Sequence, residues 1–285
     1  MKLINSENTI IPYYTFENLA EAGFPVNAFT TRLLRQNGKL CQSFRPLMRP
    51  DSDPDEVNNC IRLMLDQFGT DKSHLVKSAQ KHTANIHVVT ESFMSRDKKD
   101  LECIDGLITN IPGVTLQTLG ADCPSVFLAD PVHKAIGLCH SGRKGTQQHI
   151  SAKMLQAMTA KYGTHASDVL AGISPGICVS CYEVGDDVAQ DFIDDYLGST
   201  LFADQSIQQH DDNISAGTDL GLLKKSDHKY HIDLNRSISL SLQSAGVPSE
   251  NIELSDICTK CRSDIFYSFR GDGRIINENC ALFRI

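Results

Sequence analysis

Cysteine and histidine residues near the middle of the chain have the types and spacing of a reactive or metal-binding site. An apolar run begins just after Cys123, a polar turn follows at Asp130-Pro131, and a second apolar run ends at His140. If the turn is centred between Pro131 and Val132, Cys123 and His140 face each other on an antiparallel pair, with Cβ atoms roughly 4.5 to 5.5 Å apart. A thiolate and an imidazole at that spacing can share a metal ion or act as nucleophile and base.

A zinc or copper site normally needs a third protein ligand, and His82 is the first candidate because it precedes an expected strand. Two histidines and one cysteine leave a fourth position for water, which is the pattern of a catalytic zinc site. Asp122 is a candidate for proton transfer, and equally for a turn or capping carboxylate. His87 is expected to be structural within its strand. The histidines expected at the surface are His74, His133, His149, His165, His210 and His228.

The glycine-bracketed loop after His140 has the features of an anion-binding site. It carries two cations, Arg143 and Lys144, and a helix is expected to start at Thr146. Free backbone N–H groups and the positive end of a helix dipole favour a negative group there. We therefore expect a phosphate or an oxyanion beside the cysteine and the histidine.

Two CxxC pairs form a separate candidate for metal binding. Cys178 and Cys181 form the first pair, Cys258 and Cys261 form the second, and 76 residues separate the pairs. Local zinc ribbons have a separation of about 15 to 20 residues, so that arrangement is not expected. A long-range four-cysteine zinc site stays open, and reduced structural thiols are the default interpretation.

The elements that must position these residues alternate irregularly between helix and strand. Helices are expected over 54–68, from Thr146 to near Gly163, along an apolar stripe over 184–197, and over 234–245. Strands are expected over 86–90, 106–109, 125–129 and 135–139. Consecutive strands favour a layered mixed α/β or α+β fold over a Rossmann domain. Residues 1–285 are expected to form one domain, since no linker or repeat interrupts them.

Composition excludes several classes of protein. The 285 residues carry a formal net charge of −8, which disfavours non-specific nucleic-acid binding because that needs a positive field. An apolar run of about 18 residues, which a membrane helix requires, is absent from the sequence. The first residues lack the apolar segment of a signal peptide, so a cytoplasmic location is expected. In that reducing compartment the ten cysteines are expected to be mostly thiols.

Motifs along most of the chain, in order, resemble those of the YfiH-type family, long labelled multicopper polyphenol oxidase or laccase-domain proteins. The matching segments are Ala28-Phe29-Thr30-Thr31-Arg32, Gln80-Lys81-His82, Ala121-Asp122-Cys123, 139–146, Cys181-Tyr182-Glu183-Val184-Gly185, 258–261, 266–270 and Asp272-Gly273. Members of this family are understood as purine nucleoside phosphorylases with adenosine deaminase activity. One departure is that the Trp-Arg pair of the family is Arg143-Lys144 here.

The resemblance implies a layered α/β/β/α sandwich of the α+β class with mixed sheets, similar to bacterial cysteine hydrolases. It implies phosphorolysis and deamination of purine nucleosides, with zinc or, alternatively, copper as cofactor, and a monomer or weak homodimer that binds neither nucleic acid nor membrane. The implied metal ligands and catalytic residues are His82, Cys123 and His140, with Asp122 as a further catalytic candidate. The candidates for binding phosphate or substrate are Lys144, Arg143, Thr146, Gln80 and Arg32.

Three other functions remain open at this point. A copper oxidase acting on phenols would need more than one copper site, and the sequence offers one coherent His/Cys trio. A metal-free cysteine hydrolase would use Cys123 as nucleophile and His140 as base. A binding or regulatory protein descended from such an enzyme is the third, favoured by the Arg143-Lys144 departure.

Overall fold

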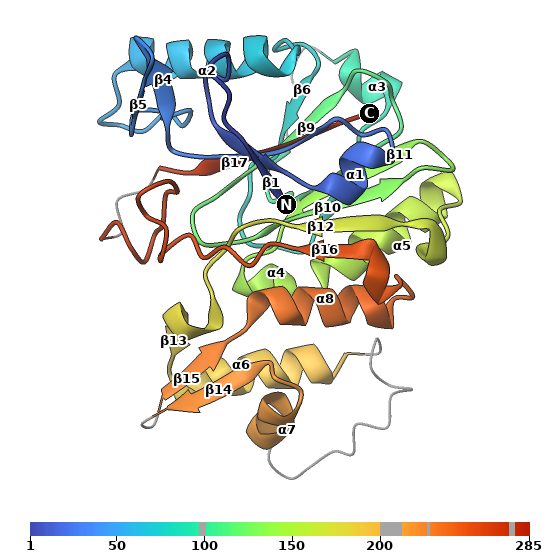
Figure 1. The fold of residues 1–285 in the computed structure, drawn as a ribbon. Coiled ribbons are helices and arrows are strands. Elements are labelled where there is room, and N and C mark those ends of the chain that lie inside the picture. Colours follow the sequence, from blue (N-terminus) through green and yellow to red (C-terminus); the bar gives the residue numbers. More distant parts are fainter. Residues whose placement is uncertain (97–100, 200–212, 227–228, 274–276) are drawn as a thin grey trace.

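Two six-stranded sheets packed face to face, with helices on both outer faces, form the main body of the protein (Figure 1). The computed structural model describes residues 1–96, 101–199, 213–226, 229–273 and 277–285. Both sheets contain parallel and antiparallel pairs. The expected α/β/β/α sandwich with mixed sheets is therefore confirmed.

The first sheet joins strands from both ends of the described chain. In spatial order it contains β1 (Lys2–Ile4), β2 (Tyr13–Thr15), β3 (Val26–Thr30), β17 (Asn279–Arg284), β9 (Thr115–Gly120) and β6 (Leu75–Lys77). The second sheet contains β16 (Ile252–Leu254), β12 (Leu170–Ile173), β10 (Ser125–Asp130), β11 (Ala135–His140), β8 (Gly106–Thr109) and β7 (Ile86–Val88). The four expected strands lie within or closely match β7, β8, β10 and β11.

Most of the helices cover the two outer faces and the edges of the sandwich (Figure 1). They are α1 (Glu17–Glu21), α2 (Pro54–Phe68), α3 (Glu91–Met94), α4 (Arg143–Gln147), α5 (Ile150–Tyr162), α6 (Asp186–Leu197), α7 (Asn213–Asp219) and α8 (Leu234–Ser244). The smaller elements are the β4–β5 hairpin (Leu34–Gln36, Lys39–Cys41), β13 (Glu183–Val184), β14 (Leu223–Ser226), β15 (Lys229–Ile232), and the 3₁₀ turns η1 (Ala166–Asp168), η2 (Val179–Cys181) and η4 (Ser249–Asn251).

Apolar side chains hold the layers together. Phe127 of β10 contacts the rings of Phe16 and Phe283 between the two sheets. Helix α2 covers the first sheet, whereas α5 and α8 cover the second (Figure 1). The α2 bounds agree with the prediction, because the Asp53 carboxylate accepts a hydrogen bond from Asp55 N–H and Gly69 ends the helix at φ 60°.

Below the second sheet, α6 and α7 pack with the three-stranded sheet of β13, β15 and β14 (Figure 1). The apolar stripe expected over 184–197 is only partly correct: Phe192 is fully buried in α6 beside Ile193, whereas Val184 lies in β13, before the helix begins. In the part of the chain that the structure describes, every helix is too short or too polar to cross a membrane.

The predicted register of the β10–β11 hairpin is wrong by two residues. Ser125, rather than Cys123, lies opposite His140. The turn is longer than expected because the Asp130 carboxylate accepts hydrogen bonds from the N–H groups of Val132 and His133, and Lys134 adopts φ 51°. Cys123 therefore precedes the strand and lies in the loop between β9 and β10.

The prediction of one helix that starts at Thr146 is also wrong, because the structure has two helices in this region. Helix α4 begins at Arg143, and α5 begins at Ile150 after His149 at φ 55°. Thr146 does not cap either helix: its hydroxyl donates to the Ser141 carbonyl oxygen at 3.1 Å. This contact fixes the loop that follows His140, and α5 ends at Gly163 as expected.

Candidate functional site

His82, Cys123 and His140 come together from three separate segments. One ligand atom from each lies within 4.8 Å of the others. His82 precedes β7, Cys123 follows β9, and His140 ends β11. The proximity is as the sequence predicted, although the hairpin register that motivated it is not. The backbone adopts a left-handed conformation at His82, with φ 59°, and at Asp122, the residue before Cys123, with φ 81°.

Gly142 leaves the space between these three side chains open. A Cβ atom at this position would lie 2.9 Å from Cys123 Sγ, 2.9 Å from His82 Cδ2 and 3.3 Å from His140 Cε1. The three donors thus surround a volume that any larger residue would fill. Two imidazoles and a thiol around an open volume form a donor set that suits zinc or copper.

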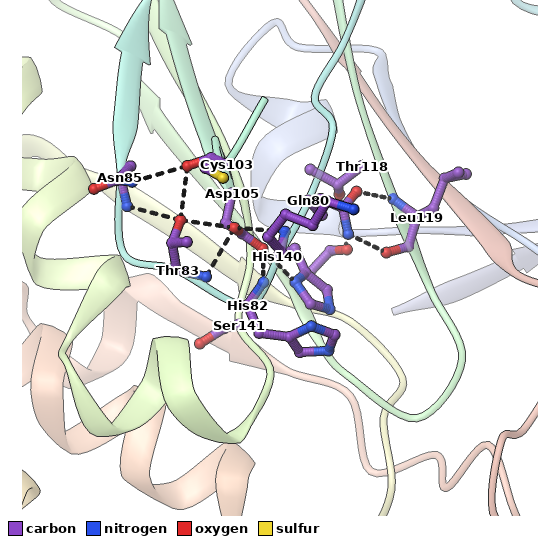
Figure 2. Close-up of polar contacts among 12 residues, drawn as sticks. Gln80, His82, Thr83, Asn85, Cys103, Asp105, Thr118, Leu119, His140 and Ser141 are labelled. Atoms are coloured by element: carbon purple, nitrogen blue, oxygen red, sulfur yellow. Dashed lines mark hydrogen bonds and ion pairs between the residues drawn. The ribbon is translucent and has the colours of Figure 1, made fainter. Parts of the chain in front are cut away.

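A buried carboxylate, Asp105, positions both histidines (Figure 2). Its Oδ1 accepts hydrogen bonds from His140 Nδ1 and from the backbone N–H of His82, each at 3.0 Å. Its Oδ2 accepts from the N–H groups of Lys81 and Thr83 and from the Thr83 hydroxyl. Because an ionised carboxylate only accepts, His140 carries its proton on Nδ1 and leaves Nε2 for Cys123 or a metal.

The charges of these groups depend on one another. Burial alone would raise the pKa of Asp105, but hydrogen bonds from His140 and from the Thr83 and Lys81 N–H groups lower it to about 2. Burial would also raise the pKa of the Cys123 thiol, yet the charge and hydrogen bonds of His140 and His82 lower it to about 7. Burial lowers the pKa of His140, but Cys123 and Asp105 outweigh it and raise that pKa to about 10. Without a bound cation, the site therefore holds a thiolate and an imidazolium near pH 8.

This charge pair predicts the pH dependence of Cys123 alkylation. In protein stripped of metal, the rate of reaction with iodoacetamide should fall as the pH drops through about 7, because the thiolate gains a proton there. In the His140→Ala variant the midpoint should move up toward the ordinary thiol value of 9.0, since the neighbouring positive charge is gone. Mass spectrometry of the Cys123 peptide measures both rates. Equal midpoints in the two proteins would contradict the pairing.

The three donors lie in a cavity of about 420 Å³, a volume typical of small-molecule sites. One part of its wall is apolar and aromatic, formed by Ile177, Tyr182, Leu234 and Phe269. The charged residues of the wall are Arg49, Arg143, Arg270, Asp122 and Glu278. The cavity thus combines a surface for a flat apolar group with three cations.

The cavity contains some of the predicted substrate-binding residues and leaves others outside. Arg143 lines it and donates to Gln147 Oε1 at 2.9 Å, and Gln80 lines it while its amide pairs with the backbone of Leu119. Among the described residues, the lining does not include Lys144, Thr146 or Arg32. Lys144 is exposed, whereas Arg32 pairs with Asp272 at 3.0 Å.

Asp122 lies in the cavity wall, but both of its oxygens have protein partners. Oδ1 accepts a hydrogen bond from the Thr259 hydroxyl and Oδ2 accepts from Arg270 N–H, each at 2.7 Å. These contacts favour the turn carboxylate over the proton-transfer group, the two roles that the sequence left open.

Sequence reasoning did not assign roles to Asp105, Arg49, Arg270 or Tyr182. Asp105 directly precedes a fully buried strand. A carboxylate at the start of such a strand is the feature of the sequence that indicates a functional role for this residue. Arg270 and Tyr182 belong to motifs of the family but have no role assigned from the sequence. In the structure the Arg270 guanidinium lies 5.4 Å from the centre of the Tyr182 ring. Arg49 lies in a loop that carries no motif.

The other histidines that the structure describes lie away from these three. His74 and His165 are exposed and His133 is half-buried. The expectation for His149 is wrong, because its ring is buried between Ser241 Oγ and the Tyr196 carbonyl oxygen. His87 is half-buried in β7 against the Phe93 ring, and His210 and His228 lie outside the described residues.

The fold and the site define a class: layered α/β/β/α proteins with a His–Cys–His cluster where strand ends meet a pocket. Residues 26–278 match the family model described as multi-copper polyphenol oxidoreductase laccase, and the chain belongs to this family. This confirms the resemblance seen in the motifs.

Similar proteins include two enzymes and two solved structures. Purine nucleoside phosphorylase YlmD of Bacillus subtilis (strain 168) is 31% identical over 226 residues, which cover 78% of this chain and 74% of the relative. Adenosine deaminase RL5, from an unknown prokaryotic organism, is 29% identical over 72% of each chain. The YfiH structure from Bacillus licheniformis has a TM-score of 0.74 and 26% identity over 91% of this chain and 92% of that one. YlmD from Geobacillus stearothermophilus shares the fold with a TM-score of 0.78 and 24% identity, over 98% and 97% of the two chains.

Proposed function

We propose that this protein is a zinc-dependent purine nucleoside enzyme. It would cleave adenosine, inosine and guanosine-type nucleosides with phosphate, releasing the base and ribose 1-phosphate, and would deaminate adenosine to inosine. The observation that carries the proposal is the meeting of His82, Cys123 and His140 in a cavity that also holds three arginines and an aromatic wall. The names of two relatives, a purine nucleoside phosphorylase and an adenosine deaminase, support the substrate class.

The metal would be held by His82, Cys123 and His140. When bound, zinc supplies a Lewis acid that polarises an oxygen ligand and lowers the pKa of water. The volume beside Gly142 accommodates an ion, and the lowered pKa of Cys123 favours the thiolate that metals bind. Asp105 holds His140 in the tautomer whose Nε2 is available as a ligand.

The substrate would be bound by two parts of the cavity wall. The whole chain carries a formal charge of −8, yet Arg49, Arg143 and Arg270 face one cavity and offer paired donors to a phosphate. The aromatic rings of Tyr182 and Phe269 offer a surface for the purine. The sugar would lie between them, where a phosphate oxygen can form a bond to the anomeric carbon as the bond to the purine breaks. The proton of the hydrogen phosphate passes to the departing purine nitrogen, so that the free base and ribose 1-phosphate are formed.

A direct assay tests the proposal. Purified protein is incubated with inosine or adenosine, with and without phosphate, and the products are separated by chromatography. Free base should form only with phosphate, whereas inosine should form from adenosine in either buffer. Cys123→Ala should lose both activities by at least about 10²-fold, and Cys41→Ser, which changes an exposed thiol outside the cavity, should retain them. No turnover by the wild type, or equal turnover by Cys123→Ala, would overturn the proposal.

A metal-free cysteine hydrolase is the second candidate, and one observation favours it. Cys123, His140 and Asp105 form a hydrogen-bonded triad of nucleophile, base and orienting carboxylate, which is the arrangement that cysteine hydrolases use. A chelator separates the two functions. Covalent labelling of Cys123 by substrate-like acyl reagents, with activity unchanged by chelator, would support the hydrolase and contradict the zinc enzyme.

The copper oxidase alternative is not favoured by the donor sets. Across the described residues, the other candidate metal group consists of four cysteines and contains no histidine. A phenol oxidation assay with copper-loaded protein tests this alternative. The cytoplasmic location and the monomer or weak homodimer remain predictions.

A further inference from the structure

The two CxxC pairs, which the proposed function does not use, meet in the structure. The Sγ atoms of Cys178, Cys181, Cys258 and Cys261 all lie within 4.8 Å of one another, and those of Cys181 and Cys261 are 3.5 Å apart. All four are free thiols. Four sulfurs at the corners of a regular zinc site, with bonds of about 2.3 Å, are separated by about 3.8 Å.

Backbone contacts hold the two CxxC segments in register. Cys258 Sγ accepts hydrogen bonds from the N–H groups of Cys178 at 3.3 Å and Cys261 at 3.5 Å. Gly176 and Cys258 form a parallel bridge, in which Thr259 N–H donates to the Gly176 carbonyl oxygen at 3.0 Å. N–H donors aimed at sulfur stabilise a thiolate over a thiol. The arrangement is therefore suited to ligands that must be deprotonated.

We propose that these four cysteines bind a structural zinc ion. Four thiolates complete a tetrahedron and leave no position for water or substrate, which is the pattern of structural sites. Soft sulfur ligands in this geometry select zinc or iron–sulfur chemistry, and two CxxC turns supply four ligands for a single ion. This site is separate from the His82–Cys123–His140 cluster and has a different donor set.

The proposed zinc site lies directly behind the wall of the catalytic cavity. Tyr182, which lines the cavity, follows Cys181, and Ile177, which also lines it, precedes Cys178. Ile177 N–H donates to the Asp122 carbonyl oxygen at 2.8 Å, and the Thr259 hydroxyl donates to the Asp122 carboxylate at 2.7 Å. Zinc would therefore join two distant segments and fix the loop that carries Cys123.

Metal analysis of protein purified under reducing conditions without added metal tests the proposal. The double variant Cys178→Ser/Cys261→Ser should bind one zinc fewer per chain than the wild type. Cys41→Ser serves as the matched control and should keep the wild-type content. The same comparison is made in a Cys123→Ala background, in which the His82 cluster lacks its thiol ligand, so the loss of one zinc is counted without that cluster. Failure of the nucleoside assay leaves this count unaffected.

A second measurement does not depend on folding of a variant. Titration of the wild type with a mercurial thiol reagent in the presence of a zinc-sensitive dye should release one zinc as these four thiols react, in addition to the ion of the His82 cluster. In the Cys123→Ala protein this release should persist, because the proposed site does not use Cys123. Unchanged zinc content in the double variant, iron in place of zinc, or a disulfide between these cysteines in protein kept reduced would each overturn the proposal.

Discussion

Asp105→Asn should lower kcat/KM for nucleosides by on the order of 10²-fold or more, although it changes only one atom of the side chain. The amide oxygen best serves the three donors from Lys81 and Thr83. The amide NH₂ then faces His140 Nδ1 and the backbone N–H of His82, so His82 N–H loses its acceptor and His140 must carry its proton on Nε2. A protonated Nε2 cannot bind a metal or accept the proton of Cys123, and steady-state kinetics with metal analysis should show the loss of activity and of metal.

Thr83→Val provides the control for this prediction. It removes the hydroxyl contacts with Asp105 Oδ2 at 2.8 Å, with the Cys103 carbonyl oxygen and with the Asn85 N–H, but leaves the contact between Oδ1 and His140. Its cost should be about 1 kcal/mol in the free energy of unfolding, with kcat/KM within a few-fold of the wild type. If Thr83→Val lost as much activity as Asp105→Asn, the carboxylate would only support the loop, and the tautomer argument would be wrong.

Gly142→Ala is the second change expected to have a large effect. The new methyl group would lie 2.9 Å from Cys123 Sγ and 2.9 Å from His82 Cδ2, so the donors must separate to admit it. A displacement of about 1 Å in a site of this kind can reduce the rate about 10²-fold. We expect the variant to fold, to lose the zinc held by His82, Cys123 and His140, and to lose nucleoside turnover to a similar extent.

Gly185→Ala is the matched comparison. Gly185 caps α6 in the same extended conformation in which Gly142 caps α4, with φ and ψ of −78° and 171° against −69° and 176°. Its Cβ would approach within 3 Å only the carboxylate end of Asp187, a flexible side chain. Circular dichroism and metal content separate the two variants. Full activity and metal content in Gly142→Ala would show that the donors do not meet beside this glycine.

Local patterns in the sequence were sufficient to predict four strands of the second sheet and the bounds of α2, because capping and periodicity act over a few residues. They did not predict the strands of the first sheet, since pairs such as β3 with β17 at its centre depend on residues far apart in the chain. The register of β10 and β11 was wrong because the Asp130 side chain lengthens the turn, and a change of turn length shifts every facing pair.

The candidate site was predicted more successfully than the hairpin that suggested it. Cys123 and His140 meet because the chain turns at Asp122, not because they face each other across strands. Arg49 and Arg270 come to the cavity on loops without regular structure, where spacing gives no information. For the four cysteines the sequence left both a zinc site and reduced structural thiols open. The 76 residues between the two CxxC pairs contain no local pattern that indicates whether the pairs meet.

The position of β17 affects the protein while it is being made. This strand lies between β3 and β9 in the first sheet, and Cys280 N–H donates to the Thr30 hydroxyl across 250 residues. At about 5 to 20 residues per second, β3 leaves the ribosome roughly 12 to 50 s before its central partner is translated. During that interval the two halves of the sheet present open edges to other nascent chains. The first sheet can therefore be completed only after β17 has been synthesised, long after β3 and β9.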